Sequence, residues 1–337
     1  MIGRLFHAWE RRLASVDTNR VVRPFEWGED WLGLDPGGTD PAGSVLAWTR
    51  AAMADTDRFY GAERGTTFER EGDLLRFPSA VTTPEPVNNT VEVRIFPADP
   101  RRSGARRRAV VVLPQWNSDA EGHVGLCRLL ARFGLTALRL SLPYHDARKP
   151  ADLQRADYIV SSNLGRTLAA NRQAVLDAKR TVDWLEREGF AHVGILGTSL
   201  GSCLAMLTMS HDARIKAGVF NHISPYFADV VWRGLSTRHV RAGLEGHITL
   251  DALREIWLPI SPWPFIDRVR GRNVRLVYAL FDETFPVDLS RMFLAEFDRR
   301  HVPHDVARLP CGHYTTGKVP FKFLDGYYLT EFLVRNV

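Results

Sequence analysis

The chain contains little cysteine and no long apolar run, and each of these absences excludes a class of protein. Its three cysteines, Cys127, Cys203 and Cys311, form no C-x-x-C pair, so neither a disulfide framework nor a zinc site is indicated. A reducing compartment fits this cysteine usage. No stretch approaches the ~18 apolar residues of a membrane span, and the N-terminus has no unbroken apolar segment of the signal-peptide kind. We therefore expect a cytoplasmic location.

The chain also lacks a strong charge of either sign. Lys and Arg number 44 against 39 Asp and Glu, a net charge of +5 over 337 residues. Nucleic-acid recognition favours basic residues that alternate with aromatic ones on one face. The densest basic run has no aromatic residue and reads as a solvated turn, so we expect no nucleic-acid partner. This run consists of Arg101, Arg102, Arg106, Arg107 and Arg108.

Residues 1 to 88 are expected to form an irregular, partly helical N-terminal extension packed on the body of the protein. Pro24, Pro36 and Pro41 break regular structure in this segment. Before them, apolar residues recur at helical spacing: Ile2, Leu5, Phe6, Trp9, Leu13 and Val16. Such a helix either docks on the protein's own surface or lies on a membrane. We favour docking, because packed amphipathic helices are the common case.

Residues 89 to 337 alternate between apolar strand patterns and helical patterns. Strands are expected at 91–96, 109–113, 135–142, 192–196, 216–220, 275–281 and 305–309. This alternation predicts an α/β fold with a mostly parallel sheet flanked by helices. In such a sheet, functional sites form at the carboxyl ends of the strands. Residues 222–270 fit no strand–helix unit, and we expect them to form a small helical, aromatic cap inserted into the domain.

The strongest local signal is the sequence Gly197-Thr198-Ser199-Leu200-Gly201. An apolar strand leads into it, and a helix of small and apolar residues leaves it. A sharp strand-to-helix turn of this G-x-S-x-G type lifts the serine hydroxyl out of the sheet. The helix that follows directs free N–H groups and its positive dipole end toward that hydroxyl. We therefore interpret Ser199 as a nucleophile.

A nucleophilic serine needs a base, and the base needs an orienting acid. In chain order these should follow the serine as Asp or Glu and then His. Asp282 directly follows the strand at 275–281, with Glu283 as its neighbouring rival. His313 follows the last strand, next to Gly312, and is the expected general base. His145 follows an earlier strand, either as part of the pocket or as a loop residue with a local hydrogen bond.

The developing oxyanion needs two hydrogen-bond donors. One is expected to be the backbone N–H of Leu200, the residue after the nucleophile. The other should come from the loop after the strand at 109–113, with Trp116 favoured and Asn117 as the alternative.

With these motifs, residues 90–335 resemble the α/β-hydrolase superfamily, from the nucleophile turn through the acid to the histidine. Segments 113–117 and 142–150 are similar to esterase-like branches near the acetyl xylan esterase and dienelactone hydrolase groups. Many members of the superfamily have His-Gly before the oxyanion residue, whereas this chain has Pro114-Gln115. This departure concerns the second oxyanion donor. The resemblance implies an α/β-hydrolase fold and a Ser-His-Asp triad.

We expect a serine hydrolase that cleaves a carboxylic ester through an acyl-enzyme, without a metal or an organic cofactor. The aromatic residues Tyr226, Phe227, Trp257 and Trp263 of the cap are expected to line the substrate pocket and favour an apolar substrate group. The same triad suits an amidase, a peptidase or an acyltransferase. A hydrolase-like module that binds a ligand without turnover is a further alternative. The oligomeric state is left open.

Overall fold

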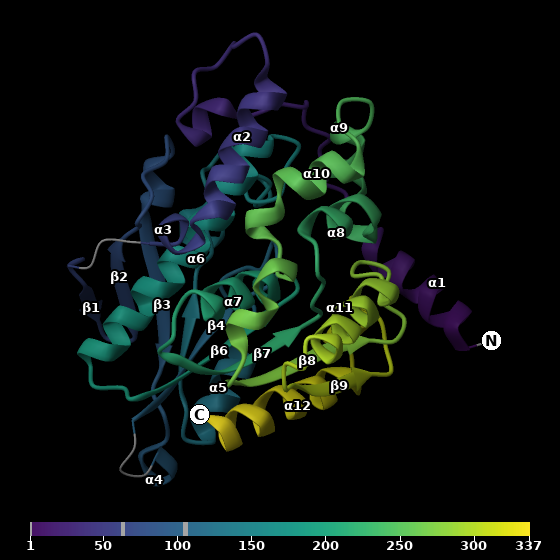
Figure 1. Cartoon of the computed structure of the whole chain (residues 1–337). Helices are drawn as coiled ribbons and strands as arrows, with labels where there is room; N and C mark the ends of the chain where they lie inside the picture. Colours follow the sequence, from purple (N-terminus) through teal and green to yellow (C-terminus); the bar gives the residue numbers. More distant parts are fainter. Residues whose placement is uncertain (1, 62–64, 104–106) are drawn as a thin grey trace.

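The centre of the fold is the apolar run from Ala109 to Leu113, which forms most of strand β4 (Arg108–Leu113). All five of these residues are buried, as expected for a strand covered on both faces. Figure 1 shows the strand in the middle of the computed structural model, which describes residues 2–61, 65–103 and 107–337.

The described residues form one nine-stranded sheet, in the order β1-β2-β3-β5-β4-β6-β7-β8-β9. The six strands from β5 to β9 in this order are parallel, whereas β1, β2 and β3 run antiparallel to their neighbours. The predicted mostly parallel sheet is thereby confirmed. The remaining strands are β1 (Glu69–Glu71), β2 (Leu74–Pro78), β3 (Thr90–Phe96), β5 (Thr136–Leu140), β6 (His192–Thr198), β7 (Ile215–Asn221), β8 (Asn273–Ala279) and β9 (Asp305–Leu309).

Helices cover both faces of the sheet. The side chains of β4 alternate between two buried clusters, because successive residues of a strand point to opposite faces. One cluster contains apolar residues of α6 (Leu164–Arg187), α7 (Leu200–Ser210) and α11 (Val287–Arg299). The other contains those of α5 (Val124–Arg132) and α12 (Phe321–Asn336). The layers can be followed in Figure 1.

The N-terminal extension contributes more to the fold than its irregular sequence suggests. No strand is predicted there, yet residues 69–78 form the hairpin β1–β2, and β2 pairs with β3 of the main sheet. The prediction missed these strands because they are short and because an edge hairpin has a weak apolar pattern, with all three residues of β1 exposed.

The first helix, α1 (Ile2–Ala14), lies against the loop that follows β9. Glu10 of α1 is fully buried, and its carboxylate accepts hydrogen bonds from the N–H groups of Tyr314, at 2.9 Å, and Thr315, at 2.8 Å. Phe6 stacks on Phe281, with 4.6 Å between the ring centroids. The helix is therefore docked on the body, while Ile2 on its outer side stays exposed.

Within the described part of the chain, no helix combines the length and the apolarity that crossing a membrane requires.

The inserted segment between β7 and β8 is helical, with α8 (Phe227–Arg233), α9 (Arg238–Leu244) and α10 (Leu250–Ile256). The N-terminal extension holds this segment in place. The Thr49 hydroxyl of α2 (Pro41–Ala54) donates to the Ile256 carbonyl at 3.1 Å, and the Tyr60 hydroxyl donates to the Pro259 carbonyl at 2.9 Å.

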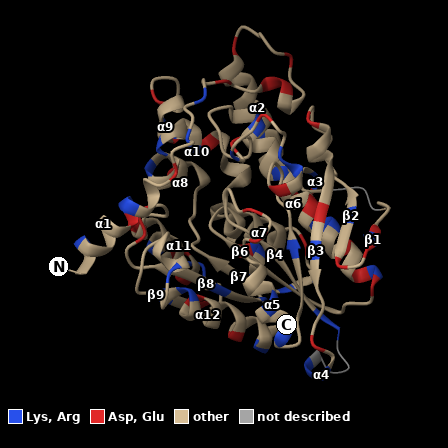
Figure 2. Cartoon of the chain, turned by 180° about the vertical axis from the view of Figure 1, so that it is seen from behind, with Lys and Arg blue, Asp and Glu red and all other residues tan. Residues whose placement is uncertain are grey.

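The structure describes the basic run near residue 105 in part, namely Arg101, Arg102, Arg107 and Arg108. Arg101 and Arg102 lie exposed on the short helix α4 (Pro100–Ser103), and Arg106 is outside the described residues. The Arg107 guanidinium donates to the Glu188 carbonyl, and that of Arg108 donates to the Val334 carbonyl. Figure 2 shows basic and acidic residues interspersed along the chain.

The buried Glu10 is predicted to stabilise the fold through the loop after β9. Replacing Glu10 with Ala leaves two buried N–H groups without acceptors, which should lower the free energy of unfolding by about 2–4 kcal/mol. Urea denaturation measures this change. The exposed Arg12 on the same helix is the control, and Arg12→Ala should change stability by less than about 0.5 kcal/mol. Equal effects of the two substitutions would contradict the prediction.

Candidate active site

Ser199 stands at the turn between β6 and α7 in a strained backbone conformation, with φ 58° and ψ −120°. Its N–H donates to the Asn221 carbonyl of the neighbouring strand at 2.8 Å. The flanking residues must be glycine because neighbouring backbone atoms leave no room for a Cβ atom. A Cβ atom on Gly197 would overlap the Gly201 carbonyl oxygen, and one on Gly201 would overlap the Leu113 carbonyl oxygen. The turn therefore holds the Ser199 hydroxyl at the carboxyl end of the sheet, as the G-x-S-x-G pattern predicts.

His313 lies in the loop after β9 and faces Ser199. Its Nε2 atom is 3.1 Å from Ser199 Oγ, and its Nδ1 atom is 3.0 Å from Asp282 Oδ2. The ring stacks on Phe285, with 5.3 Å between centroids and 4° between planes. Burial by itself lowers the pKa of His313, but the charge of Asp282 and the hydrogen bond to it leave the pKa raised above its ordinary value.

Asp282 follows β8 and is buried, with four hydrogen bonds to its carboxylate. Oδ1 accepts from the N–H groups of Thr284 at 2.8 Å and Phe285 at 2.7 Å, and Oδ2 accepts from two imidazoles. Burial opposes ionisation, but the charge of His313 and the hydrogen bonds from both histidines hold the pKa of Asp282 well below its usual range. An ionised carboxylate only accepts hydrogen bonds, so both imidazoles donate from Nδ1.

The rival acid, Glu283, points away from this group. Its carboxylate accepts two hydrogen bonds from the Arg11 guanidinium of α1, at 3.1 and 2.7 Å. The structure therefore brings Asp282, and not Glu283, to His313.

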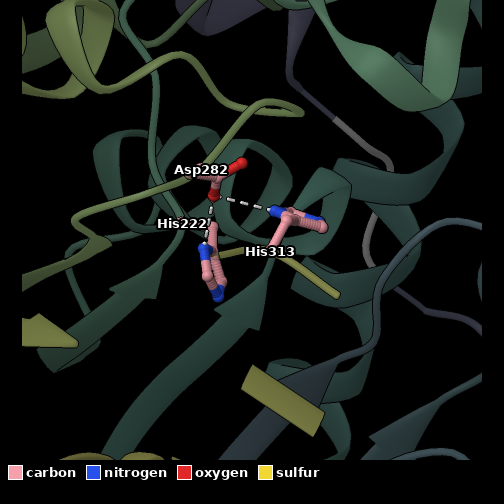
Figure 3. A group of neighbouring side chains, drawn as sticks. All are labelled: His222, Asp282 and His313. Carbon is pink, nitrogen blue, oxygen red and sulfur yellow. Dashed lines mark hydrogen bonds and ion pairs between the residues drawn. The ribbon is translucent and has the colours of Figure 1, made fainter. Parts of the chain in front are cut away.

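The second imidazole on Asp282 belongs to His222, which the sequence reasoning missed. His222 directly follows β7, and its Nδ1 atom is 2.8 Å from Asp282 Oδ2. Figure 3 shows the carboxylate between the two rings, whose centroids are 4.5 Å apart. Its place at the carboxyl end of a central strand is the signal that pointed to Asp282 and His313 and that could also have identified His222.

Two backbone N–H groups near Ser199 are available for an oxyanion. Among the described residues, the N–H of Leu200 and the N–H of Trp116 have no hydrogen-bond partner. The N–H of Asn117, the alternative donor, is not free in this structure, because it donates to His145 Nε2 at 2.9 Å. Burial lowers the pKa of His145 to about 4, so the ring stays neutral and accepts this bond. His145 therefore orients the loop that carries Trp116.

Comparisons with known proteins concern the fold. Residues 91–237 match a family model described as alpha/beta hydrolase domain containing 18. The chain has the α/β-hydrolase fold. The structure is similar to an acetyl xylan esterase from Paenibacillus sp. R4, with 14% identity and a TM-score of 0.58 over 90% of this chain and 98% of that one.

Other similar structures include both esterases and peptidases. An esterase from Pyrococcus furiosus has 16% identity and a TM-score of 0.51, over 83% of this chain and 95% of that one. An acylaminoacyl peptidase from Pyrococcus horikoshii has 15% identity and a TM-score of 0.60, over 80% of this chain. This chain spans 42% of the length of that peptidase. At such low identity these likenesses establish the α/β-hydrolase fold alone.

Two cavities open on Ser199. The large cavity has a volume of about 700 Å³ and includes His313, His222, Arg155 and Asp325 in its wall. The small cavity has a volume of about 30 Å³. Its wall consists of Trp116, Val160, Ser199, Leu200, Cys203, Phe227, Val230, Val231, Ser236, Thr237 and Phe285.

Of the four cap aromatics expected to line the substrate pocket, Phe227 lies in the wall of the small cavity. Tyr226, Trp257 and Trp263 line neither cavity. Trp257 is fully buried and its indole N–H donates to the Leu164 carbonyl at 3.3 Å, while Trp263 stacks on Tyr226. These rings pack the helical insert onto the body, because burying their large apolar area there is favourable.

Among the described residues, His222, Asp282 and His313 form the one group whose possible metal ligands, one atom from each, lie within 4.8 Å of one another. Both Nδ1 atoms contact the same carboxylate oxygen at hydrogen-bond distance. A metal ion between them would have to break both bonds, so the geometry is that of a hydrogen-bonded triad with an added imidazole.

Asp282 is predicted to control the reactivity of Ser199, and Glu283 is the matched control beside it. The Asp282→Asn variant cannot hold the His313 ring in the required tautomer. We therefore expect the rate of Ser199 labelling to fall by up to about 10⁴-fold. Glu283→Gln should alter the rate by less than about twofold, because Glu283 forms a surface ion pair with Arg11. The rate of Ser199 labelling by a fluorophosphonate measures both, and a larger loss in Glu283→Gln would reverse the assignment.

His222 is predicted to act as a positioning residue for Asp282. His222→Phe keeps a ring of similar size but removes the N–H donor to Asp282. We expect the labelling rate to fall by about 10-fold or more, the equivalent of one hydrogen bond to a charged group. His222→Asn retains an N–H donor near the Nδ1 position and should recover most of the rate.

The control for His222 is His211, which hydrogen-bonds to the Leu207 carbonyl away from both cavities. His211→Phe should leave the labelling rate unchanged. If the Phe and Asn variants of His222 behaved alike, the hydrogen bond to Asp282 would have no positioning role.

Proposed function

We propose that this protein is a serine hydrolase that cleaves a carboxylic ester through an acyl-enzyme. The observation that carries the proposal is the chain of hydrogen bonds from Ser199 through His313 to Asp282, with two unpaired backbone N–H groups beside it. Acyl transfer needs these parts together: a nucleophile, a base in contact with it, an oriented acid and two oxyanion donors.

In the first step, His313 Nε2 accepts the proton of Ser199 as Oγ attacks the ester carbonyl carbon. The N–H groups of Leu200 and Trp116 donate to the oxygen that becomes negative. Because these groups belong to a helix start and to a loop fixed by His145, they need no reorientation during the reaction. Asp282 stabilises the imidazolium that forms.

In the second half, the protonated His313 gives its proton to the leaving alcohol oxygen as the carbonyl–oxygen bond breaks. A water molecule then attacks the acyl-enzyme, with His313 again acting as the base, and Ser199 is released with a carboxylic acid product. No step requires a metal ion or an organic cofactor.

Hydrolysis of an amide by the same groups is the competing activity, since peptidases are among the proteins of similar fold. The experiment therefore compares esters and amides of the same acyl group. We expect turnover of p-nitrophenyl esters to exceed that of the matching p-nitroanilides, and a preference for the anilides would assign the protein to the peptidases.

Ser199→Ala is predicted to abolish esterase turnover. Loss of the nucleophile should lower kcat by about 10⁴-fold or more, with only oxyanion stabilisation left. The Ser202→Ala variant is the control, because the Ser202 hydroxyl is buried and donates to the carbonyls of Ser199 and His222 without reaching either cavity. Steady-state kinetics on p-nitrophenyl acetate, with circular dichroism to verify folding, measures both variants. Near-wild-type turnover in folded Ser199→Ala would refute the proposal.

A further inference from the structure

The two cavities on Ser199 differ in size by more than an order of magnitude, at about 30 and 700 Å³. An ester bound at Ser199 has two parts to place, an acyl group and an alcohol. If the protein is the serine hydrolase proposed above, the residues in the two walls indicate which cavity holds the acyl group and which holds the alcohol.

The position of His313 assigns the alcohol to the large cavity. The leaving oxygen must receive its proton from His313 Nε2, so the alcohol has to lie on the side of that ring. His313 lines the large cavity and not the small one. Leu200, which carries an unpaired N–H for the oxyanion, lines the small cavity only. The acyl group therefore extends from the carbonyl carbon into the small cavity.

The small cavity limits the length of the acyl chain. Phe227, Val230 and Val231 of α8 close it, and its exposed inner surface is almost wholly apolar. A single water needs roughly 10–15 Å³ of such a cavity, so about 30 Å³ has room for two or three small groups, enough for a propionyl chain and far too little for an octanoyl chain. Protein interiors close to native density do not expand at low cost for a longer chain.

The large cavity is wide enough for an alcohol of several rotatable bonds or a ring, and most of the residues in its wall have polar side chains among apolar surface. Lys322 has no hydrogen-bond partner for its ammonium among the described residues, although it lies over the Phe323 ring. Among the described residues, Asp325 accepts hydrogen bonds only from the Asn221 side chain, and burial raises the pKa of Asp325 to about 6. Because both residues line the cavity and have capacity for further hydrogen bonds, they favour a ligand with several hydroxyls over an alkyl chain.

We propose that the substrate is a short-chain ester, acetyl or propionyl, of a polyhydroxy alcohol about the size of a sugar. The Ser199 Oγ–carbon bond forms first, and the carbon–alcohol oxygen bond then breaks as the oxyanion returns to a carbonyl. The alcohol leaves with the proton from His313, and water releases acetate or propionate. The apolar group expected from the sequence is thus confined to the small cavity.

The acyl half of the proposal is tested with p-nitrophenyl acetate, butyrate and octanoate. Wild-type kcat/KM should fall by about 10-fold or more from acetate to octanoate, as for small misfits in an apolar pocket. Val231→Ala enlarges the small cavity and should raise the butyrate-to-acetate ratio several-fold. Val240→Ala removes an equally buried valine of the inserted segment outside both cavities and should leave the ratio unchanged.

A second pair of variants tests the same assignment in case Val231→Ala does not fold. Phe227→Leu enlarges the small cavity, and Phe265→Leu alters a buried phenylalanine of the same segment that lines neither cavity. A wild-type preference for octanoate, or equal ratios in the cavity and control variants, overturns the acyl assignment.

The alcohol half is tested with two acetate esters, a monoacetylated monosaccharide and hexyl acetate. We expect kcat/KM to be about 10-fold or more higher for the sugar ester, within the range that polar pocket contacts provide. Asp325→Asn should lower kcat/KM for the sugar ester more than for p-nitrophenyl acetate. Asp298→Asn, an exposed carboxylate of α11, should change neither.

The outcomes separate this inference from the proposed function. If Ser199 reacts with a fluorophosphonate and esters are cleaved, but hexyl acetate or octanoate is preferred, the substrate assignment fails while the hydrolase assignment stands. If only anilides are cleaved, or if no ester is cleaved at all, the proposed function itself fails and the substrate class falls with it.

Discussion

The site depends on one buried negative charge, the carboxylate of Asp282. A carboxylate without partners would be too costly to bury, and here four donors compensate it. Two are backbone N–H groups of its own loop, and two are imidazoles that follow β7 and β9. The carboxylate thereby ties together the ends of three adjacent strands. It also fixes the tautomer of His313, since an ionised acid only accepts and His313 Nε2 is left free to accept from Ser199.

His222 adds a second imidazole to the Ser-His-Asp arrangement, as a further donor to Asp282. Both imidazoles donate to Oδ2, so the carboxylate is held by a second residue besides His313. Its pKa is low in spite of full burial. This restraint matters because catalytic geometry tolerates errors of only about 0.5 Å.

Segments distant in sequence hold the loops of the site in position. The Glu10 carboxylate of α1 accepts hydrogen bonds from N–H groups of the loop that carries His313. The Arg11 guanidinium of the same helix donates to Glu283, the residue next to Asp282. One helix of the N-terminal extension thus contacts the loops of both the base and the acid. On the other side, the extension holds the helical insert through Thr49 and Tyr60, and that insert closes the small cavity through α8. The extension is therefore part of the machinery that shapes the site.

The α/β fold, the turn at Ser199 and the positions of Asp282 and His313 after their strands could be predicted from the sequence. These features are local: strand patterns have a period of two residues, the turn needs glycines at fixed offsets, and the ends of parallel strands converge at one edge. The other features of the site depend on contacts between distant segments, which no local pattern specifies. Glu10 and His222 carry no local pattern that names their partners, and aromatic residues look alike in sequence whether they line a cavity or pack a helix. Trp257 and Phe227 are both buried, and they could not be told apart until the structure placed Phe227, but not Trp257, in the wall of the small cavity beside Ser199.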